Sequence, residues 1–205
     1  MKPIDFWFSI GSTYTCLTVL RLAEVTARTG ASFRWRPFDV RSIMLAQNNI
    51  PFRDKPVKAA HMWRDIERRA ARHGLALRLP APYPLERLGF ANRIALVGVA
   101  EGWCEAYTTA AYRLWFQQGL PAGSEPAVTE ALTGIGQDPA RVIALADSPE
   151  IRNALARETA EAEALGVFGA PSFVVAGEVF WGDDRLEDAI EWAAHGRLLP
   201  IPPQP

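Results

Sequence analysis

A serine at the turn between an expected strand and an expected helix is the first candidate for chemistry. In the stretch FSIGSTYTCL, residues 8–17, Ser12 follows an aromatic and β-branched run and precedes apolar residues at helical spacing. At the start of a helix, unpaired backbone N–H groups and the helix dipole both favour a negative charge. From the spacing alone, capping the helix is the simpler role for Ser12, and holding an anion is the alternative.

Other reactive side chains lack the partners that a site of their own would need. The chain has two cysteines, Cys16 and Cys104, which are too few for a disulfide framework and too isolated for a zinc site. We expect both to be small buried residues. The Gly-x-Ser-x-Gly motif is absent from the sequence, which disfavours a serine hydrolase. No metal site is predicted, because the histidines have no partners at metal or triad spacing; they are His61, His73 and His195.

The composition is that of a globular protein without a general affinity for polyanions. Of the 205 residues, 49% are hydrophobic, enough for a sizeable core, and the formal net charge is −1. This charge gives no general attraction to nucleic acid or to an anionic membrane. No stretch reaches the roughly 20 apolar residues of a membrane span, and residues 1–10 lack the pattern of a signal peptide. We therefore expect a cytoplasmic protein.

The elements around Ser12 are expected to begin with a βαβ unit. Residues 4–8 and 31–39 have the aromatic and alternating content of strands, and a helix that ends at Gly30 lies between them. Because the two strands are joined by a helix, we expect them to be parallel neighbours in one sheet.

A long helical segment follows. From residue 42 to residue 166, apolar residues recur three and four positions apart, which predicts helices. Two of these helices are expected to begin at an N-cap followed by proline, at Asp138 and at Ser148.

Strands return near the end of the chain. PSFVV and EVFW, separated by Ala176 and Gly177, predict a hairpin. Asp183 and Asp184 are then expected to cap a last helix. The complete order is therefore βαβ, a helical segment and ββα.

This order and two motifs resemble the thioredoxin-fold family that includes DsbA, the kappa-class glutathione transferases and the 2-hydroxychromene-2-carboxylate isomerases. DFWFSIGSTYTCL, residues 5–17, resembles the first strand and active-site turn of the last two groups. GVFGAPSFVVAGEVFWGDDRL, residues 166–186, is the more specific match, and RDIERRAARHGL, residues 64–75, is a weaker one. The resemblance spans nearly the whole chain and implies an α/β, DsbA-like fold, in which a thioredoxin-like fold carries a large all-helical insertion.

The resemblance also implies how the chain is divided and assembled. Residues 1–40 and 166–198 would form a discontinuous thioredoxin-like domain, and residues 41–165 a helical insertion domain whose last helix leads back into the sheet. Residues 199–205 would form an extended tail. The family suggests a homodimer.

The resemblance gives Ser12 a catalytic role. Laid on the Cys-x-x-Cys turn of the redox enzymes, residues 12–15 read Ser-Thr-Tyr-Thr, so dithiol chemistry at this turn is excluded. Glutathione would supply the sulfur atom. A free thiol titrates near pH ~8.5, and a helix terminus contributes only about 0.3 to 1 kcal/mol. A hydrogen bond donated by Ser12 to the thiolate, at roughly 1.5 to 3 kcal/mol, could lower the pKa by a further one to two units.

Further residues are implied to hold glutathione. Pro171 stands where the family has a cis-proline, which leaves the backbone of Ala170 free to pair with an extended peptide. Asp183 and Asp184 stand where the family binds the γ-glutamyl amino group, and Trp181 precedes them in the same motif. Each has a simpler alternative: an ordinary proline at a strand start, helix caps, and a packed tryptophan.

The implied substrate is a small aromatic carboxylate. Asn49, Arg53 and Lys58 are candidates for binding it, since a cation suits a carboxylate, and exposure to solvent is their alternative. Tryptophans are candidates for lining an aromatic pocket, with core packing as the alternative; they are Trp7, Trp35, Trp63 and Trp181.

Taken together, the resemblance implies a glutathione-dependent cis-trans isomerase. It would convert 2-hydroxychromene-2-carboxylate-like acids to trans-o-hydroxybenzylidenepyruvate-like products by reversible addition of the thiolate. One alternative is a kappa-class-like transferase or peroxidase, which consumes glutathione, and another is a non-catalytic adaptor that binds peptides at the Pro171 groove. The chain departs from the family pattern at Ser9, where many relatives have an acidic residue, and at Thr13, where they have proline.

Overall fold

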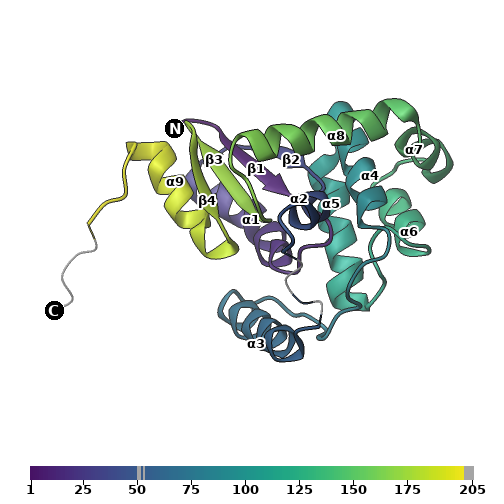
Figure 1. Ribbon diagram of the computed structural model, residues 1–205, viewed down its shortest axis with the longest axis horizontal. Coiled ribbons are helices and arrows are strands. Elements are labelled where there is room, and N and C mark those ends of the chain that lie inside the picture. The colour runs from purple at the N-terminus through teal and green to yellow at the C-terminus, as the bar shows by residue number, and fades with distance from the viewer. Residues whose placement is uncertain (50–51, 53, 201–205) are drawn as a thin grey trace.

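A mixed four-stranded sheet is the centre of the computed structural model (Figure 1), which describes residues 1–49, 52 and 54–200. β1 pairs with β2 in parallel, whereas the β1/β3 and β3/β4 pairs are antiparallel. The predicted order of βαβ followed by ββα is confirmed, and strands from both ends of the chain share one sheet. The strands lie in the order β2-β1-β3-β4; they are β1 (Ile4–Phe8), β2 (Phe33–Pro37), β3 (Ser172–Val175) and β4 (Glu178–Trp181).

Helices form most of the remaining structure. Between residues 42 and 166 the described residues contain no strand, as the apolar spacing predicts. In Figure 1, α4 to α7 gather at the end of the molecule away from α9, and α3 lies apart from them on the side opposite α8. The helical elements in chain order are α1 (Thr15–Thr29), α2 (Val40–Ala46), α3 (Pro56–Arg72), α4 (Leu88–Glu101), α5 (Cys104–Arg113), the π-helical turn η1 (Leu114–Gln118), α6 (Ala127–Gly134), α7 (Pro139–Ala146), α8 (Pro149–Ala164), the 3-10 turn η2 (Asp183–Arg185) and α9 (Leu186–His195).

Alternate residues of β1 face opposite sides of the sheet, and helices cover both sides. Phe6 and Phe8 are fully buried in the larger core, which also contains residues of α1, α4, α5 and α9. Trp7 points to the other side and packs with Phe38 and Val174 beneath α2 and α8. The end of β1, where Ser12 follows, is therefore anchored from two directions.

The predicted helix starts are right in the insert and wrong at the end of the chain. The side chains of Asp138 and Ser148 accept hydrogen bonds from first-turn backbone N–H groups of α7 and α8, at 3.0 and 3.3 Å. By contrast, Asp183 and Asp184 lie in η2, and α9 begins after Arg185 without a side-chain cap among the described residues. The reason is that the Asp183 carboxylate is bound by side chains of other helices.

A glycine allows α4 and α5 to meet closely at the tight connection between them. A Cβ atom at Gly98 would lie 2.7 Å from the ring of Trp103 and 2.8 Å from the Cα of Cys104. The contact therefore has no room for a methyl group. On the same helix, a Cβ atom at Gly89 would have no neighbour within 4 Å.

We expect Gly98→Ala to lower the free energy of unfolding by about 1 to 3 kcal/mol, because Trp103 or the start of α5 must move. Gly89→Ala is the matched control and is expected to stabilise the helix by up to about 1 kcal/mol. Urea denaturation followed by circular dichroism measures both variants. Equal stabilities for the two would contradict the close contact.

Candidate active site

Ser12 lies where the turn after β1 meets the segment before β3. Its half-buried hydroxyl donates to the carbonyl oxygen of Ala170 at 2.6 Å. The backbone N–H of Thr15 points at the same hydroxyl oxygen from 3.4 Å, a long contact of the kind that a helix cap makes. The Ala170–Pro171 peptide bond is cis, as the resemblance implies. The structure thus brings three expected site residues together: Ser12, Ala170 and Pro171.

Two buried side chains of the insert hold the turn that carries Ser12. Asn92 of α4 accepts from the backbone N–H of Ile10 at 2.7 Å and donates to the hydroxyl of Ser9 at 2.9 Å. The hydroxyl of Tyr112 on α5 lies 3.0 Å from the carbonyl oxygens of both Ser9 and Ser12. The serine at position 9, a departure from the family pattern, is therefore part of a buried polar network.

Sequence reasoning missed both of these residues. A signal for Asn92 was present, since it is the one amide in the run LGFANRIALVGV, residues 88–99, in which Arg93 is the only other polar residue. A buried amide needs hydrogen-bond partners, so its position indicates a specific contact. Tyr112 gave no such signal, because a tyrosine on an apolar helix face is compatible with simple packing.

One face of α3 contacts the two residues that immediately precede α1. Thr13, the second departure from the family pattern, donates its hydroxyl to the sulfur of Met62 at 3.1 Å. The hydroxyl of Tyr14 donates to Asp65 at 3.0 Å. Burial and the hydrogen bond to Asp65 raise the pKa of Tyr14 to about 12, so this hydroxyl stays protonated at neutral pH.

Asp183 is the centre of a buried ionic cluster. Its side chain is 1% exposed, and one oxygen accepts from Thr18 at 3.0 Å and from Arg21 at 3.1 Å. The other oxygen accepts from Arg69 of α3 at 2.8 Å. Arg21 also binds Glu187. Both oxygens of Asp183 are thus engaged by cations and a hydroxyl of the chain itself.

Asp184 has a different environment from its neighbour. Its side chain is half exposed and pairs with Arg185 at 3.0 Å, and Arg185 also reaches Asp188 at 2.7 Å. An exposed carboxylate beside an exposed guanidinium can receive the ammonium and carboxylate groups of an amino acid. Of the two aspartates predicted for the site, Asp184 is the one that presents its charge to solvent.

Trp181 flanks the cis-proline segment. It is 54% exposed, and its ring lies 4.8 Å from that of Phe168, which is 43% exposed. A Cβ atom at Gly169 would lie 2.4 Å from the indole nitrogen, so the indole rests directly on the backbone before Ala170. Trp181 is therefore an exposed residue beside the cis-proline segment rather than a core residue.

The other predicted tryptophans are placed differently. Trp7 is fully buried against Phe38, and Trp35 packs edge-on to Phe6 and Phe8. Trp7 belongs to the core, and Trp35 is partly buried against it. Trp63 of α3 lies 6.0 Å from the ring of Tyr83 and 6.3 Å from that of Phe116, so it belongs to an aromatic cluster of the insert.

Two of the candidate substrate residues, Asn49 and Lys58, make no hydrogen bond with Ser12 within the described part of the chain. Asn49 is exposed just after α2, where its backbone N–H donates to Met44 at 2.8 Å. Lys58 is exposed on α3, with its ammonium 6.0 Å from the ring centre of Phe52. Arg53 lies outside the described residues.

The described residues offer no other obvious reactive group. Cys16 and Cys104 are buried free thiols, as predicted, and burial raises the pKa of both, that of Cys104 to about 12. Within residues 1–49, 52 and 54–200, no group of acidic, histidine or cysteine side chains could hold a metal ion. In the same residues, no helix has the length and apolar content to cross a membrane.

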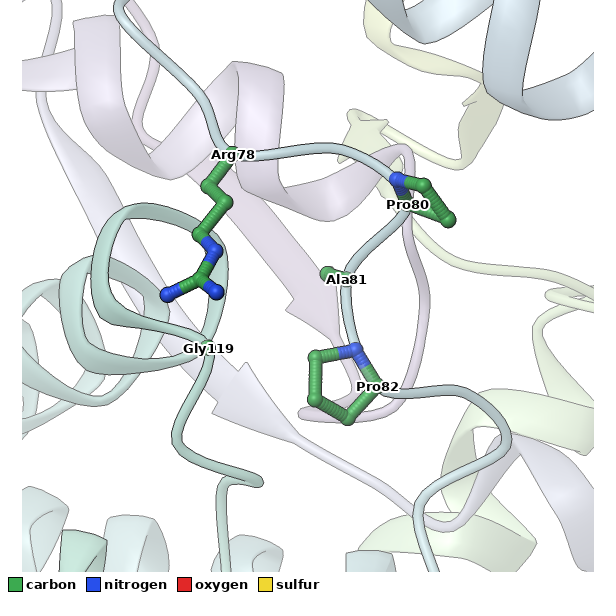
Figure 2. A pocket seen from close by; sticks show the side chains of 5 residues that line it. All are labelled: Arg78, Pro80, Ala81, Pro82 and Gly119. Atoms are coloured by element: carbon green, nitrogen blue, oxygen red, sulfur yellow. The ribbon is translucent and has the colours of Figure 1, made fainter.

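Two surface cavities are lined by residues other than Ser12. The first, of 280 Å³, is lined by Arg78, Pro80, Ala81, Pro82 and Gly119. Figure 2 shows Arg78 extending toward Gly119 on one side, with the proline segment on the other. The second, of 430 Å³, lies between α2 and α8. Neither is lined by a residue predicted for the site.

Comparisons with known proteins agree with this geometry. Residues 3–191 match the family described as DSBA-like thioredoxin domain. The chain is 29% identical over 188 residues to a 2-hydroxychromene-2-carboxylate isomerase of Sphingobium xenophagum, covering 91% of this chain and 95% of that protein. It is 24% identical over 208 residues to glutathione S-transferase kappa 2 of Caenorhabditis elegans, covering 94% and 92%.

A solved structure gives the same result for the fold. The structure of a 2-hydroxychromene-2-carboxylate isomerase covers 94% of this chain and 96% of its own, with a TM-score of 0.82 and 24% identity. The expected α/β fold, thioredoxin-like with a helical insertion, is confirmed.

We expect Asp183→Asn to destabilise the protein by about 3 to 5 kcal/mol, because it removes the buried counter-charge and leaves Arg21 only the half-exposed Glu187 as an ionic partner. Asp184→Asn, the adjacent and exposed control, is expected to change stability by less than about 0.5 kcal/mol. Urea denaturation compares the two. If Asp183→Asn costs no more than its neighbour, the ionic cluster does not stabilise the fold.

The same region predicts a pH dependence of stability. His73, half-buried after α3, has no hydrogen-bond partner for Nε2 among the described residues. Burial, and then the charge of Arg21, lower the pKa of His73 below its ordinary 6.5. The folded state therefore disfavours the protonated ring, so stability is complete above the unfolded pKa of 6.5 and declines as the pH falls below it.

We expect His73→Gln to remove part of this decline, while His61→Gln, exposed on α3, leaves it unchanged. Unfolding free energies measured between about pH 7 and pH 5 make the comparison. Glu187 does not interfere. Burial raises the pKa of its carboxyl group, but the bond to Arg21 and the charge of Arg21 lower it by more, so the net lowered pKa affects stability only as the pH falls below the ordinary 4.5. Parallel pH profiles for His73→Gln and the wild type would refute the assignment.

Proposed function

This chain belongs to the family of DsbA-like thioredoxin domains, and on that premise we propose that it is a glutathione-dependent cis-trans isomerase of an aromatic carboxylic acid. The substrate class is that of 2-hydroxychromene-2-carboxylate, and the relative from Sphingobium xenophagum supports this choice. The observation that carries the proposal is the Ser12 hydroxyl, which lies at the start of α1 and touches the residue before a cis-proline. The site has a donor for a thiolate and no thiol of its own.

The sulfur must come from a ligand. Cys16, four residues beyond Ser12, is fully buried, and burial raises its pKa well above the ordinary value. It is therefore a poor nucleophile. A kappa-class glutathione transferase among the relatives supports glutathione as the source.

An exchange of hydrogen bonds would prepare the site for the ligand. In the structure, the Ser12 hydroxyl donates to the Ala170 carbonyl oxygen. A peptide that lies along the segment before Pro171 would offer its own N–H to that carbonyl. Ser12 would then be released to donate to the thiolate, while the first-turn N–H groups of α1 favour the same charge.

Asp184 and Arg185 are proposed to hold the far end of glutathione. The carboxylate of Asp184 would accept the γ-glutamyl ammonium, and Arg185 would pair with the γ-glutamyl carboxylate. Both are exposed and bonded to each other at 3.0 Å. We assign Asp183 a supporting role instead, because Arg21, Arg69 and Thr18 already bind its carboxylate.

The reaction needs ring opening followed by reversible addition. Opening of the hemiketal breaks the ring carbon–oxygen bond, forms the carbonyl group and passes the hemiketal hydroxyl proton to the phenolic oxygen. The thiolate adds to the conjugated carbon of the ring-opened substrate, and the electron pair of the double bond moves to the carbonyl oxygen as an enolate. The former double bond then rotates as a single bond. When the enolate returns its electrons, the carbon–sulfur bond breaks, and the trans double bond and the thiolate are regenerated. Glutathione is therefore a cofactor in this scheme.

A transferase is the second candidate, favoured by the similarity to glutathione S-transferase kappa 2. It would use the same thiolate but keep the carbon–sulfur bond. Stoichiometry separates the two, since an isomerase turns over many substrate molecules for each glutathione.

We expect calorimetric titration to show binding of glutathione to the wild type, with ultraviolet absorbance of a thiolate at neutral pH. In Ser12→Ala, the pKa of the bound thiol should rise by about one to two units, because the substitution removes a hydrogen-bond donor to the thiolate. Turnover of 2-hydroxychromene-2-carboxylate should fall about 10- to 100-fold. No binding at millimolar glutathione, or equal thiolate absorbance in both proteins, would refute the proposal.

A matched pair of variants tests the proposed contact between Asp184 and the γ-glutamyl group. Asp184→Asn is expected to weaken glutathione binding about 10-fold or more, because it removes the partner of the ammonium group. Asp188→Asn also breaks a bond to Arg185, at 2.7 Å, and is expected to leave binding nearly unchanged. Equal affinities of the two variants would place the γ-glutamyl group elsewhere.

A further inference from the structure

We infer that Tyr112, assisted by Asn92, is a positioning residue that fixes the turn 9–12 and thereby aims the hydroxyl of Ser12 at the bound thiolate. The inference deepens the proposed function and rests on it for the identity of the ligand. Its physical basis is a set of buried hydrogen bonds between the insert and the turn.

The turn itself is closed and lies directly on α4. The backbone N–H of Ser12 donates to the carbonyl oxygen of Ser9 at 3.0 Å. Gly11 has a φ of +151°, and a Cβ atom there would lie 3.0 Å from the side chain of Leu88. The turn can therefore shift little without losing contact with the helix.

Tyr112 binds this turn through a single hydroxyl. The hydroxyl lies 3.0 Å from the carbonyl oxygens of Ser9 and Ser12, so its proton is shared by both ends of the turn. The side chain is fully buried, and burial raises the pKa of Tyr112 well above its ordinary value, which keeps the hydroxyl a donor. Its ring stacks on Trp115 at 5.7 Å, which prevents the hydroxyl from swinging away.

Asn92 fixes the same turn from α4. Its side chain is fully buried and bonds to the backbone N–H of Ile10 and to the hydroxyl of Ser9. Together with Tyr112, it determines where the carbonyl of Ser12 points and hence where its side chain lies. Because a hydrogen bond weakens steeply with angle, a small rotation of the turn costs stabilisation of the thiolate.

The neighbouring Tyr107 provides a matched control. It lies on the same helix and is 1% exposed, but its hydroxyl has no hydrogen-bond partner among the described residues. Tyr112→Phe and Tyr107→Phe thus remove the same atom from similar surroundings. Only the first removes a contact with the turn.

The test uses an introduced thiol, so that it does not depend on glutathione binding. Ser12→Cys places a sulfur atom at the start of α1, where its pKa can be read from the pH dependence of alkylation by iodoacetamide. The natural cysteines do not compete, because Cys16 and Cys104 are buried. Mass spectrometry identifies the labelled residue, and circular dichroism establishes that each variant is folded.

In the Ser12→Cys background, we expect Tyr112→Phe to slow alkylation at neutral pH about three- to tenfold, which corresponds to a thiol pKa raised by roughly half to one unit. Tyr107→Phe should leave the thiol pKa unchanged. Ser9→Ala, which removes the bond from Asn92 and leaves both helices intact, should shift the pKa in the same direction as Tyr112→Phe.

Equal thiol pKa values in folded Tyr112→Phe and Tyr107→Phe would overturn the inference. If Tyr112→Phe does not fold, Ser9→Ala decides: an unchanged thiol pKa overturns the inference, and a raised one supports it. The proposed function fails separately, when the wild type does not bind glutathione, and that result leaves the alkylation comparison intact.

Discussion

The hydrogen bond between the Ser12 hydroxyl and the Ala170 carbonyl joins two segments 158 positions apart. For these atoms to meet at 2.6 Å, β1 and β3 must be adjacent, and the chain between them must return to the end of the sheet at which β1 finishes. The antiparallel pairing of β1 with β3 places the end of one strand beside the start of the other. The site is therefore a consequence of the sheet order β2-β1-β3-β4.

The helical insert does more than fill the space between these strands. α4 and α5 supply Asn92 and Tyr112 to the turn, and α3 supplies Met62 and Asp65 to the residues just before α1 and Arg69 to Asp183. The three α3 residues, Met62, Asp65 and Arg69, are three and four positions apart, so they share one face of the helix. The insert thus binds the site from two sides, and a change within it can reach Ser12 without touching a ligand.

Much of the fold could be predicted from the sequence, because its signals are local. The alternation of Phe6, Trp7 and Phe8 and the proline after Asp138 and after Ser148 each reflect short-range geometry that the structure repeats. That Ser12 and Ala170 belong to one site was also expected, but from resemblance rather than from spacing, and their direct hydrogen bond was not. The comparisons bear out that resemblance.

What the sequence could not reveal depends on contacts between distant residues. The bonds from Asn92 and Tyr112 to the turn span 83 and 100 positions. Asp183 was expected at a helix cap, yet it is bound by Arg21 and Arg69, which are 162 and 114 positions away. A charge pattern along the chain does not indicate such pairs, because each partner is equally suited to solvent.

The most direct measurement is a crystal structure of the protein with glutathione bound. On this account, the Ser12 hydroxyl turns from the Ala170 carbonyl and lies within hydrogen-bond distance of the sulfur, while the carbonyl accepts an N–H of the ligand. If the sulfur lies elsewhere and the bond between Ser12 and Ala170 is retained, Ser12 does not stabilise the thiolate and the proposed site is wrong.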